Sequence, residues 1–172
     1  VRSIRQRLIA HFEKNEPLAS EAAESGQLLY APVTGRIRAL TRIKDPVFSS
    51  EVLGKGCAIE PSCGEVVAPA DGIVKKIAKT HHAVSLLCDN GLEVLIHVGM
   101  DTVEMNGKGF KALVKEGDKV KAGTPLLKVD LDAIRAAGHP PATAIIVTDG
   151  AGDEVKMLAE GDVAPGTPLF KV

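Results

Sequence analysis

The chain contains few aromatic residues and few cysteines, and each shortage excludes a class of protein. Its 172 residues include no Trp, one Tyr and three Cys, and the formal net charge is -1. With almost no aromatic rings for bases to stack on and no excess of positive charge, a nucleic-acid-binding role is not expected. Cys57, Cys63 and Cys88 are odd in number and form no CxxC pair, which argues against a disulfide framework and against a zinc ribbon.

The chain also lacks the segments that target proteins to membranes or for export. No apolar run approaches the roughly 20 residues that span a bilayer, and no signal-peptide pattern is present at its start. We therefore expect a cytoplasmic protein with reduced cysteines. The length suits one domain with a substantial core. Because the first residue is Val1 and not Met, we expect a processed chain or a piece of a larger one.

Residues 1–27 differ in composition from the rest of the chain. Apolar residues recur at helical spacing in residues 1–15 with basic residues between them, which predicts a basic amphipathic helix. Such a helix docks on its own domain, forms the tail of a preceding domain, or makes a weak contact with a membrane surface through residues 1–14. The Ala/Ser/Glu-rich stretch that follows suits a tether, so we predict a folded domain at 28–172.

Within that domain, glycines and prolines separate short apolar runs, a pattern typical of an all-β sandwich or barrel. Two segments recur: residues 31–37 resemble 68–74, and residues 116–126 resemble 160–169. The sequence therefore predicts a compact antiparallel β-sandwich or barrel with internal duplication.

One or two short helices are expected in this domain. The clearest lies at residues 131–137, where Asp130 or Asp132 would cap its first turn.

Two β-branched-rich runs, residues 80–88 and 92–98, predict a β-hairpin that carries the histidines. The Asn90-Gly91 pair favours a two-residue loop, which places His97 opposite Val84. Residues that pair across a hairpin share a face, so His82 is then diagonal to His97 and close enough for the two rings to meet.

The length of this loop decides which histidine pairs with His97. A four-residue loop would also bring His82 to His97, whereas a three-residue loop would turn His82 to the other face and bring His81 instead. The Asn-Gly signal favours the even loops, so we expect a His82–His97 pair with Thr80 on the same face.

The motif residues 91–103, GLEVLIHVGMDTV, and the segment Thr80-His81-His82-Ala83 carry a family resemblance. From Leu28 to Val172 the chain resembles the glucose-type IIA component of the bacterial sugar phosphotransferase system, and residues 91–103 are similar to that family's phosphorylation-site signature. The resemblance implies an antiparallel β-sandwich and assigns the second active-site histidine to His82.

The resemblance also implies a reaction. His97 would accept a phosphoryl group from the phosphohistidine of the carrier protein HPr and pass it to a cysteine of a IIB domain. A neutral imidazole nitrogen is a good nucleophile for phosphorus, and transfer needs positioning and charge stabilisation, with no metal or cofactor required. His82 would stabilise the phosphate, and the Thr80 hydroxyl would orient the rings. Gly99 leaves room for a partner and offers a carbonyl to fix the His97 tautomer.

The rim of this site is expected to dock partners. Asp45, Asp101 and the residues beside them match segments that border the family's active site, although both acids are equally suited to local turns. The apolar candidates are either core residues or an exposed docking surface. The candidate rim consists of Asp45, Val47, Phe48, Gly99, Met100, Asp101 and Val103.

Three other functions compete with this interpretation. His82 and His97 could form part of a zinc site of a hydrolase, with Cys88 or Asp101 as a third ligand; no resident metal is expected, and a zinc ion shared with a partner is the alternative. A lipoyl-type carrier is disfavoured because Lys156 lacks the flanking pattern. A regulatory module that binds transporters or enzymes according to its phosphorylation state would use the same surface.

Overall fold

The computed structural model of this chain describes residues 27–151 and 155–172. The predicted amphipathic helix and almost all of the predicted tether lie outside the described residues. The strands are β1 (Leu28–Tyr30), β2 (Gly35–Ala39), β3 (Lys55–Pro61), β4 (Glu65–Val67), β5 (Gly72–Ile77), β6 (Ala83–Cys88), β7 (Glu93–Val98), β8 (Phe110–Ala112), β9 (Lys119–Val120), β10 (Pro125–Val129), β11 (Thr143–Asp149), β12 (Lys156–Met157), β13 (Asp162–Val163) and β14 (Pro168–Lys171).

Short helices connect some of the strands. They are the 3₁₀ helices η1 (Leu40–Arg42) and η2 (Thr102–Met105) and the α-helices α3 (Pro46–Ser49) and α4 (Leu131–Ala136). The helix expected at 131–137 is thus present, and Asp130 is its N-cap, because its side chain accepts a hydrogen bond from the Ala133 N–H at 3.0 Å. In the described part of the chain, no helix is long and apolar enough to cross a bilayer.

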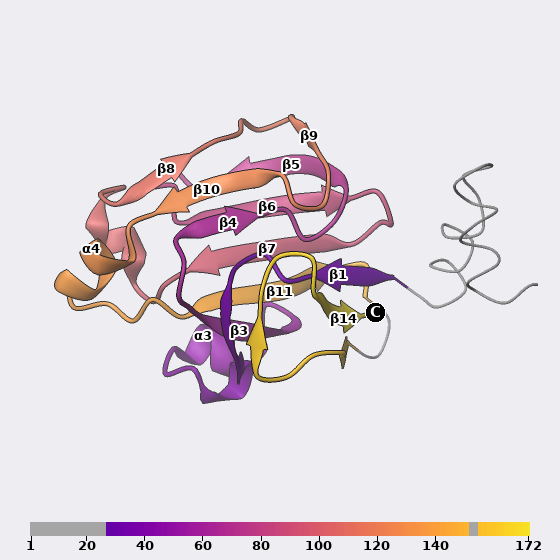
Figure 1. Ribbon diagram of the computed structural model, residues 1–172, viewed down its shortest axis with the longest axis horizontal. Helices are drawn as coiled ribbons and strands as arrows, with labels where there is room; N and C mark the ends of the chain where they lie inside the picture. The colour runs from indigo at the N-terminus through magenta and orange to yellow at the C-terminus, as the bar shows by residue number, and fades with distance from the viewer. Residues whose placement is uncertain (1–26, 152–154) are drawn as a thin grey trace, which may run out of the picture.

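The strands form one large and two small antiparallel sheets (Figure 1). The large sheet has eight strands in the order β13-β2-β3-β11-β7-β6-β5-β9, and the small sheets are β1-β14-β12 and β4-β10-β8. The expected all-β antiparallel fold is confirmed.

The internal repeat appears in the strand pairing. In the first copy, β1 pairs with β14 and β2 pairs with β13. In the second copy, the corresponding pairs are β4 with β10 and β5 with β9. Gly35 lies opposite Val163 in the first copy, and Gly72 lies opposite Val120 in the second. The two sequence echoes therefore correspond to two copies of one β framework.

Apolar residues form a separate cluster on each face of the eight-stranded sheet. The larger cluster takes residues from all three sheets and includes the inward side chains of β7, Val94, Ile96 and Val98. Because side chains alternate along a strand, His97 points to the opposite face. There a smaller cluster, formed by Leu40, Ile43, Phe48, Ala58, Met100, Ala142, Ala144 and Ile146, packs η1 and α3 onto the sheet.

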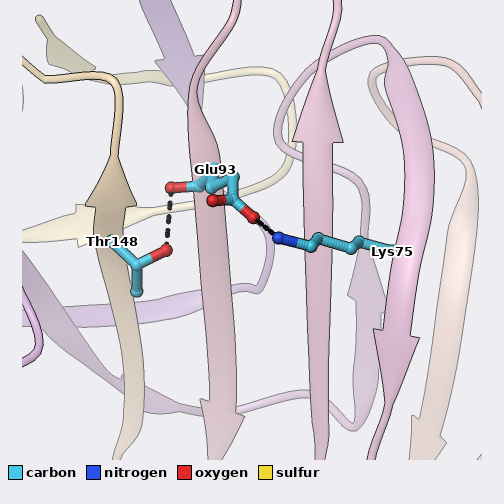
Figure 2. A network of polar contacts seen from close by, with 3 residues as sticks. All are labelled: Lys75, Glu93 and Thr148. Carbon is cyan, nitrogen blue, oxygen red and sulfur yellow. Dashed lines mark hydrogen bonds and ion pairs between the residues drawn. The ribbon is translucent and has the colours of Figure 1, made fainter.

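A polar network ties three strands together at the start of β7 (Figure 2). Lys75 on β5 reaches over β6 and forms an ion pair with Glu93 on β7. Thr148 on β11 donates a hydrogen bond to the Glu93 carbonyl oxygen at 3.3 Å. His97 lies at the other end of β7, so this network is separate from the histidine site.

Candidate active site

The hairpin that carries the histidines has a three-residue loop, so the predicted even loop is wrong. The Cys88 N–H donates to the Leu92 carbonyl oxygen at 2.8 Å, and Ala83, not Val84, lies opposite His97. The physical reason lies in the loop residues themselves. Gly91 has a φ of 90°, which suits the left-handed last position of a three-residue loop, and Asn90 Oδ1 accepts a hydrogen bond from the Leu92 N–H.

The His82 ring nevertheless contacts the His97 ring, because His82 lies outside the paired strand. β6 begins only at Ala83, and His81 just before it has a φ of 59°. The alternation of faces holds within a paired strand, and His82 lies just outside β6, where its side chain reaches the His97 ring. The two rings contact edge to face, with centroids 4.8 Å apart. The expected contact between His82 and His97 is therefore present, although the strand register from which it was predicted, with Val84 opposite His97, is not.

The protonation of His97 is set by its neighbour Gly99. His97 Nδ1 lies 2.9 Å from the Gly99 carbonyl oxygen. A carbonyl oxygen only accepts hydrogen bonds, so Nδ1 carries the proton and donates it to Gly99. In the neutral ring this leaves Nε2 unprotonated, with a lone pair available for a phosphorus atom.

Gly99 adopts a conformation that few other residues could take. Its φ is 76°, and a Cβ atom at this position would lie 2.4 Å from the Thr102 methyl carbon. Thr102 is fully buried, and its hydroxyl donates to the Val98 carbonyl oxygen at 2.5 Å. The sequence interpretation missed Thr102, although its position inside the 91–103 motif was a signal.

His82 has a polar partner on its other side. Thr80 Oγ1 lies 2.6 Å from His82 Nδ1, and the His82 side chain is almost fully buried. If the hydroxyl donates to Nδ1, the proton of the neutral His82 ring lies on Nε2 and is available as a hydrogen-bond donor. Phe110 flanks His82 with a ring-centroid distance of 6.4 Å and was not expected from the sequence.

Small side chains surround His97 within the sheet. Ala83 on β6 and Ala144 on β11 lie directly opposite His97 on its two sides, and Ala58 follows Ala144 on β3. Methyl groups at these positions leave space above the sheet next to the ring. The Phe48 ring of α3 bounds that space, with its centroid 4.9 Å from that of His97.

Burial lowers the pKa of both histidines. The pKa of His97 falls to about 4, chiefly because burial penalises the charged ring and also because the neighbouring His82 disfavours a second positive charge. The contact with Gly99 and the Asp45 carboxylate act in the opposite direction but do not compensate. The pKa of His82 is also lowered by burial. His97 is therefore neutral at physiological pH, as a nucleophile requires.

The predicted apolar rim divides into exposed and buried residues. Val47 and Val103 are 48% and 54% exposed, whereas Phe48 and Met100 are each only 5% exposed and belong to the smaller cluster. Of these four predicted rim residues, only the two valines therefore offer apolar surface to a partner.

The two acids of the predicted rim lie at the edge of one cavity. Asp45 is the N-cap of α3 and accepts a hydrogen bond from the Val47 N–H at 2.9 Å, which is the local role expected of a turn former. Asp101 is exposed and has a φ of 58°. Both line a cavity of about 690 Å³, together with Met100 and Pro140.

The described residues contain no group of three or more His, Cys, Asp or Glu side chains placed to hold a metal ion. Cys88, which was considered above beside Asp101 as a third ligand, is buried in the larger cluster at the far end of β6, where burial and nearby Asp89 raise its thiol pKa to about 11. Among the described residues, His82 and His97 could thus supply two nitrogen ligands to a metal ion, but no third His, Cys, Asp or Glu side chain is placed to join them.

This chain is similar to known proteins in sequence. A family model described as phosphoenolpyruvate-dependent sugar phosphotransferase system, EIIA 1, matches residues 27–152. The chain is 42% identical over 160 residues to the PTS system glucose-specific EIICBA component of Staphylococcus carnosus (strain TM300), covering 93% of this chain and 24% of that protein. It is 50% identical over 125 residues to the PTS system beta-glucoside-specific EIIBCA component of Bacillus subtilis (strain 168), covering 73% and 20%.

A solved structure agrees with these matches. Glucose permease IIA from Mycoplasma capricolum superposes with a TM-score of 0.80 and 32% sequence identity, over 84% of this chain and 94% of that one. By contrast, the chain spans only about a quarter of the glucose-specific relative's length.

Proposed function

Because the chain belongs to the EIIA 1 family of the phosphoenolpyruvate-dependent sugar phosphotransferase system, we propose that it is a phosphohistidine carrier whose acceptor atom is His97 Nε2. The observation that carries this proposal is the contact between His97 Nδ1 and the Gly99 carbonyl oxygen beside the His82 ring. Together these contacts produce a neutral, oriented imidazole with a second imidazole next to it.

The transfer step is a displacement at phosphorus. The bond between phosphorus and the donor's imidazole nitrogen breaks as the Nε2 lone pair of His97 forms a new bond to phosphorus. The Nδ1 proton stays on the ring and continues to bond Gly99, so the step needs no base to remove it. Because such transfers pass through a loose, metaphosphate-like state, the protein's main task is to align the two nitrogens and stabilise the phosphoryl oxygens.

His82 is the residue that stabilises the phosphoryl group. Its ring contacts His97, and donation from Thr80 to Nδ1 directs the His82 Nε2–H toward the phosphoryl oxygens. A dianionic phosphoryl group nearby would also raise the His82 pKa from its lowered value, which favours a second proton on His82 in the phosphorylated state.

The phosphoryl donor is HPr in its phosphohistidine form, and the acceptor is a cysteine of a IIB domain. Support for the acceptor comes from the relatives, whose names combine the B, C and A components in one chain. Partners dock over α3 and η2 through the exposed Val47 and Val103, with Asp45 and Asp101 as the acidic edge that a basic partner surface would meet. A cytoplasmic location accords with both partners.

The experiment is phosphorylation with purified phospho-HPr. We expect an acid-labile, base-stable adduct that peptide mapping assigns to His97, and no adduct in His97→Ala. His81→Gln is the matched control and should accept label at the wild-type rate. Full labelling of His97→Ala would refute the proposal.

A further inference from the structure

Thr102 is a fully buried polar residue that the proposed transfer step does not use directly. A buried hydroxyl must find a partner, and the Thr102 hydroxyl donates to the Val98 carbonyl oxygen at 2.5 Å. That carbonyl belongs to the peptide unit between Val98 and Gly99. Thr102 therefore holds the peptide plane immediately before the glycine whose carbonyl bonds His97.

Two further hydrogen bonds hold the same stretch of backbone. The Gly99 N–H donates to the Ala142 carbonyl oxygen at 3.0 Å, and the Met100 N–H donates to the Pro140 carbonyl oxygen at 3.0 Å. Both peptide planes that flank Gly99 are thus anchored. With its flanking groups held, the Gly99 carbonyl oxygen is directed to His97 Nδ1.

The Thr102 methyl group completes the arrangement by packing. A Cβ atom at Gly99 would come within 2.4 Å of this methyl carbon, so the methyl group lies directly against the Gly99 backbone. It thereby supports the left-handed conformation of Gly99, whose φ is 76°. A threonine thus supplies both a donor and a packing surface at this position.

We infer that Thr102 is a positioning residue for phosphoryl transfer: by holding the 98–102 loop it keeps the Gly99 carbonyl on His97 Nδ1 and so keeps Nε2 free as the nucleophile. Without this loop geometry the His97 proton can occupy either ring nitrogen, and a ring protonated on Nε2 cannot attack phosphorus through Nε2. The kinetic part of this inference rests on the proposed function, whereas the tautomer part does not.

The test compares three variants of the full chain. Thr102→Val keeps the shape of the side chain and removes the hydroxyl, and Thr102→Ser keeps the hydroxyl and removes the methyl group. Thr143→Val is the matched control, because Thr143 is equally buried and pairs with Val98 beside the loop, whereas its hydroxyl donates to Pro141 and not to a carbonyl of residues 98–102. Two-bond proton–nitrogen NMR correlations report which nitrogen of His97 carries the proton, and thermal unfolding reports the fold of each variant.

In the wild type and in Thr143→Val, the His97 proton should lie on Nδ1. In Thr102→Val it should lie partly or wholly on Nε2, and kcat for acceptance from phospho-HPr should fall by roughly tenfold, the effect of one hydrogen bond of ordinary strength. KM for phospho-HPr should not change, because the docking surface is intact. Thr102→Ser should retain the wild-type tautomer and most of the rate.

Two results would overturn the inference. One is a folded Thr102→Val protein with the proton still on Nδ1 and an unchanged kcat, and the other is an equal loss of the tautomer in Thr143→Val. Thr102→Ala, which also lacks the hydroxyl, repeats the comparison if Thr102→Val does not fold. If wild-type protein accepts no label from phospho-HPr, the proposed function fails, and the NMR result still decides the role of Thr102.

Discussion

At the scale of single residues, His97 and His82 are both neutral and both oriented. They are neutral at physiological pH because burial lowers both pKa values, and each has one ring nitrogen bound to a defined partner. Neutrality makes His97 a nucleophile, and the bound partners decide which nitrogen reacts.

The lowered pKa of His97 predicts a pH-dependent stability. In the unfolded chain its pKa is near the ordinary value of 6.5, and in the folded protein it is about 4. Between these values the unfolded state binds more protons, so the free energy of unfolding decreases as the pH falls from 6.5 to 4. His97 should account for about 3 kcal/mol of this loss. Urea unfolding at pH 7, 5 and 4 measures it.

In His97→Gln this contribution should be absent, so stability should depend less steeply on pH in that window. The lowered pKa of His82 acts with the same sign and leaves part of the slope in place. His81→Gln is the control and should keep the wild-type slope. An identical slope in His97→Gln and wild type would show that burial does not lower the His97 pKa.

The His82 ring predicts a separation between accepting and passing on the phosphoryl group. His82→Gln keeps the Nδ1 contact between His97 and Gly99, so it should still accept label from phospho-HPr. Transfer to a IIB domain should be slower by about 10²-fold or more, because a donor to the phosphoryl oxygens is lost from the transition state. Rapid-quench measurement of both half-reactions tests this. Equal slowing of both steps would contradict the assigned role.

At the level of elements, α3 connects packing to the site. Asp45 caps this four-residue helix, Pro46 occupies its first turn, and Phe48 extends from it to the His97 ring. Asp45 also raises the His97 pKa, although less strongly than burial lowers it. One carboxylate thus has a local capping role and an electrostatic effect on the nucleophile.

Two substitutions separate the capping role of Asp45 from its proposed role in docking. Asp45→Asn retains a capping oxygen and should unfold within a few tenths of a kcal/mol of wild type, because Asn and Asp cap helices about equally well. Asp45→Ala removes the cap and should lose about 1 kcal/mol. If Asp45 meets a basic surface on HPr, both variants should show a raised KM for phospho-HPr. An unchanged KM in both would exclude Asp45 from the docking surface.

At the level of the whole molecule, the ends of the described domain meet far from the histidines. Gln27 and Val172 exchange two backbone hydrogen bonds, and the Gln27 side chain donates to the Asn90 carbonyl oxygen at the tip of the β6–β7 hairpin. From that tip to His97 the six residues of β7 span about 20 Å. Chain attached before Gln27 therefore starts at the end of the sandwich opposite the site.

This arrangement predicts where the chain tolerates truncation. Removal of residues 1–26 should leave the thermal midpoint unchanged, because β1 and its pairing with β14 remain. Removal of residues 1–31 should lower the midpoint strongly, because Leu29 and Ala31 are fully buried in the larger cluster. Differential scanning calorimetry compares the two. Unfolding of the shorter truncation would place the domain boundary before residue 27.

By itself the sequence determined the all-β class, the internal duplication and the α4 helix, because these depend on local patterns of apolar, Gly and capping residues. It left the cap of α4 open between Asp130 and Asp132, and the structure shows Asp130. The sequence also predicted His97 and His82 as site residues, through residues 91–103 for His97 and the segment Thr80-His81-His82-Ala83 for His82.

Only the tertiary structure decided the geometry of the site. The loop length could not be derived from Asn90-Gly91 alone, because two-residue and three-residue loops both place a glycine at positive φ. His82 lies just outside β6, so its contact with His97 does not follow from strand alternation. The burial of Thr102 and Phe48 depends on segments distant in the chain. Such contacts are set by packing between strands, and no periodicity along one strand encodes them.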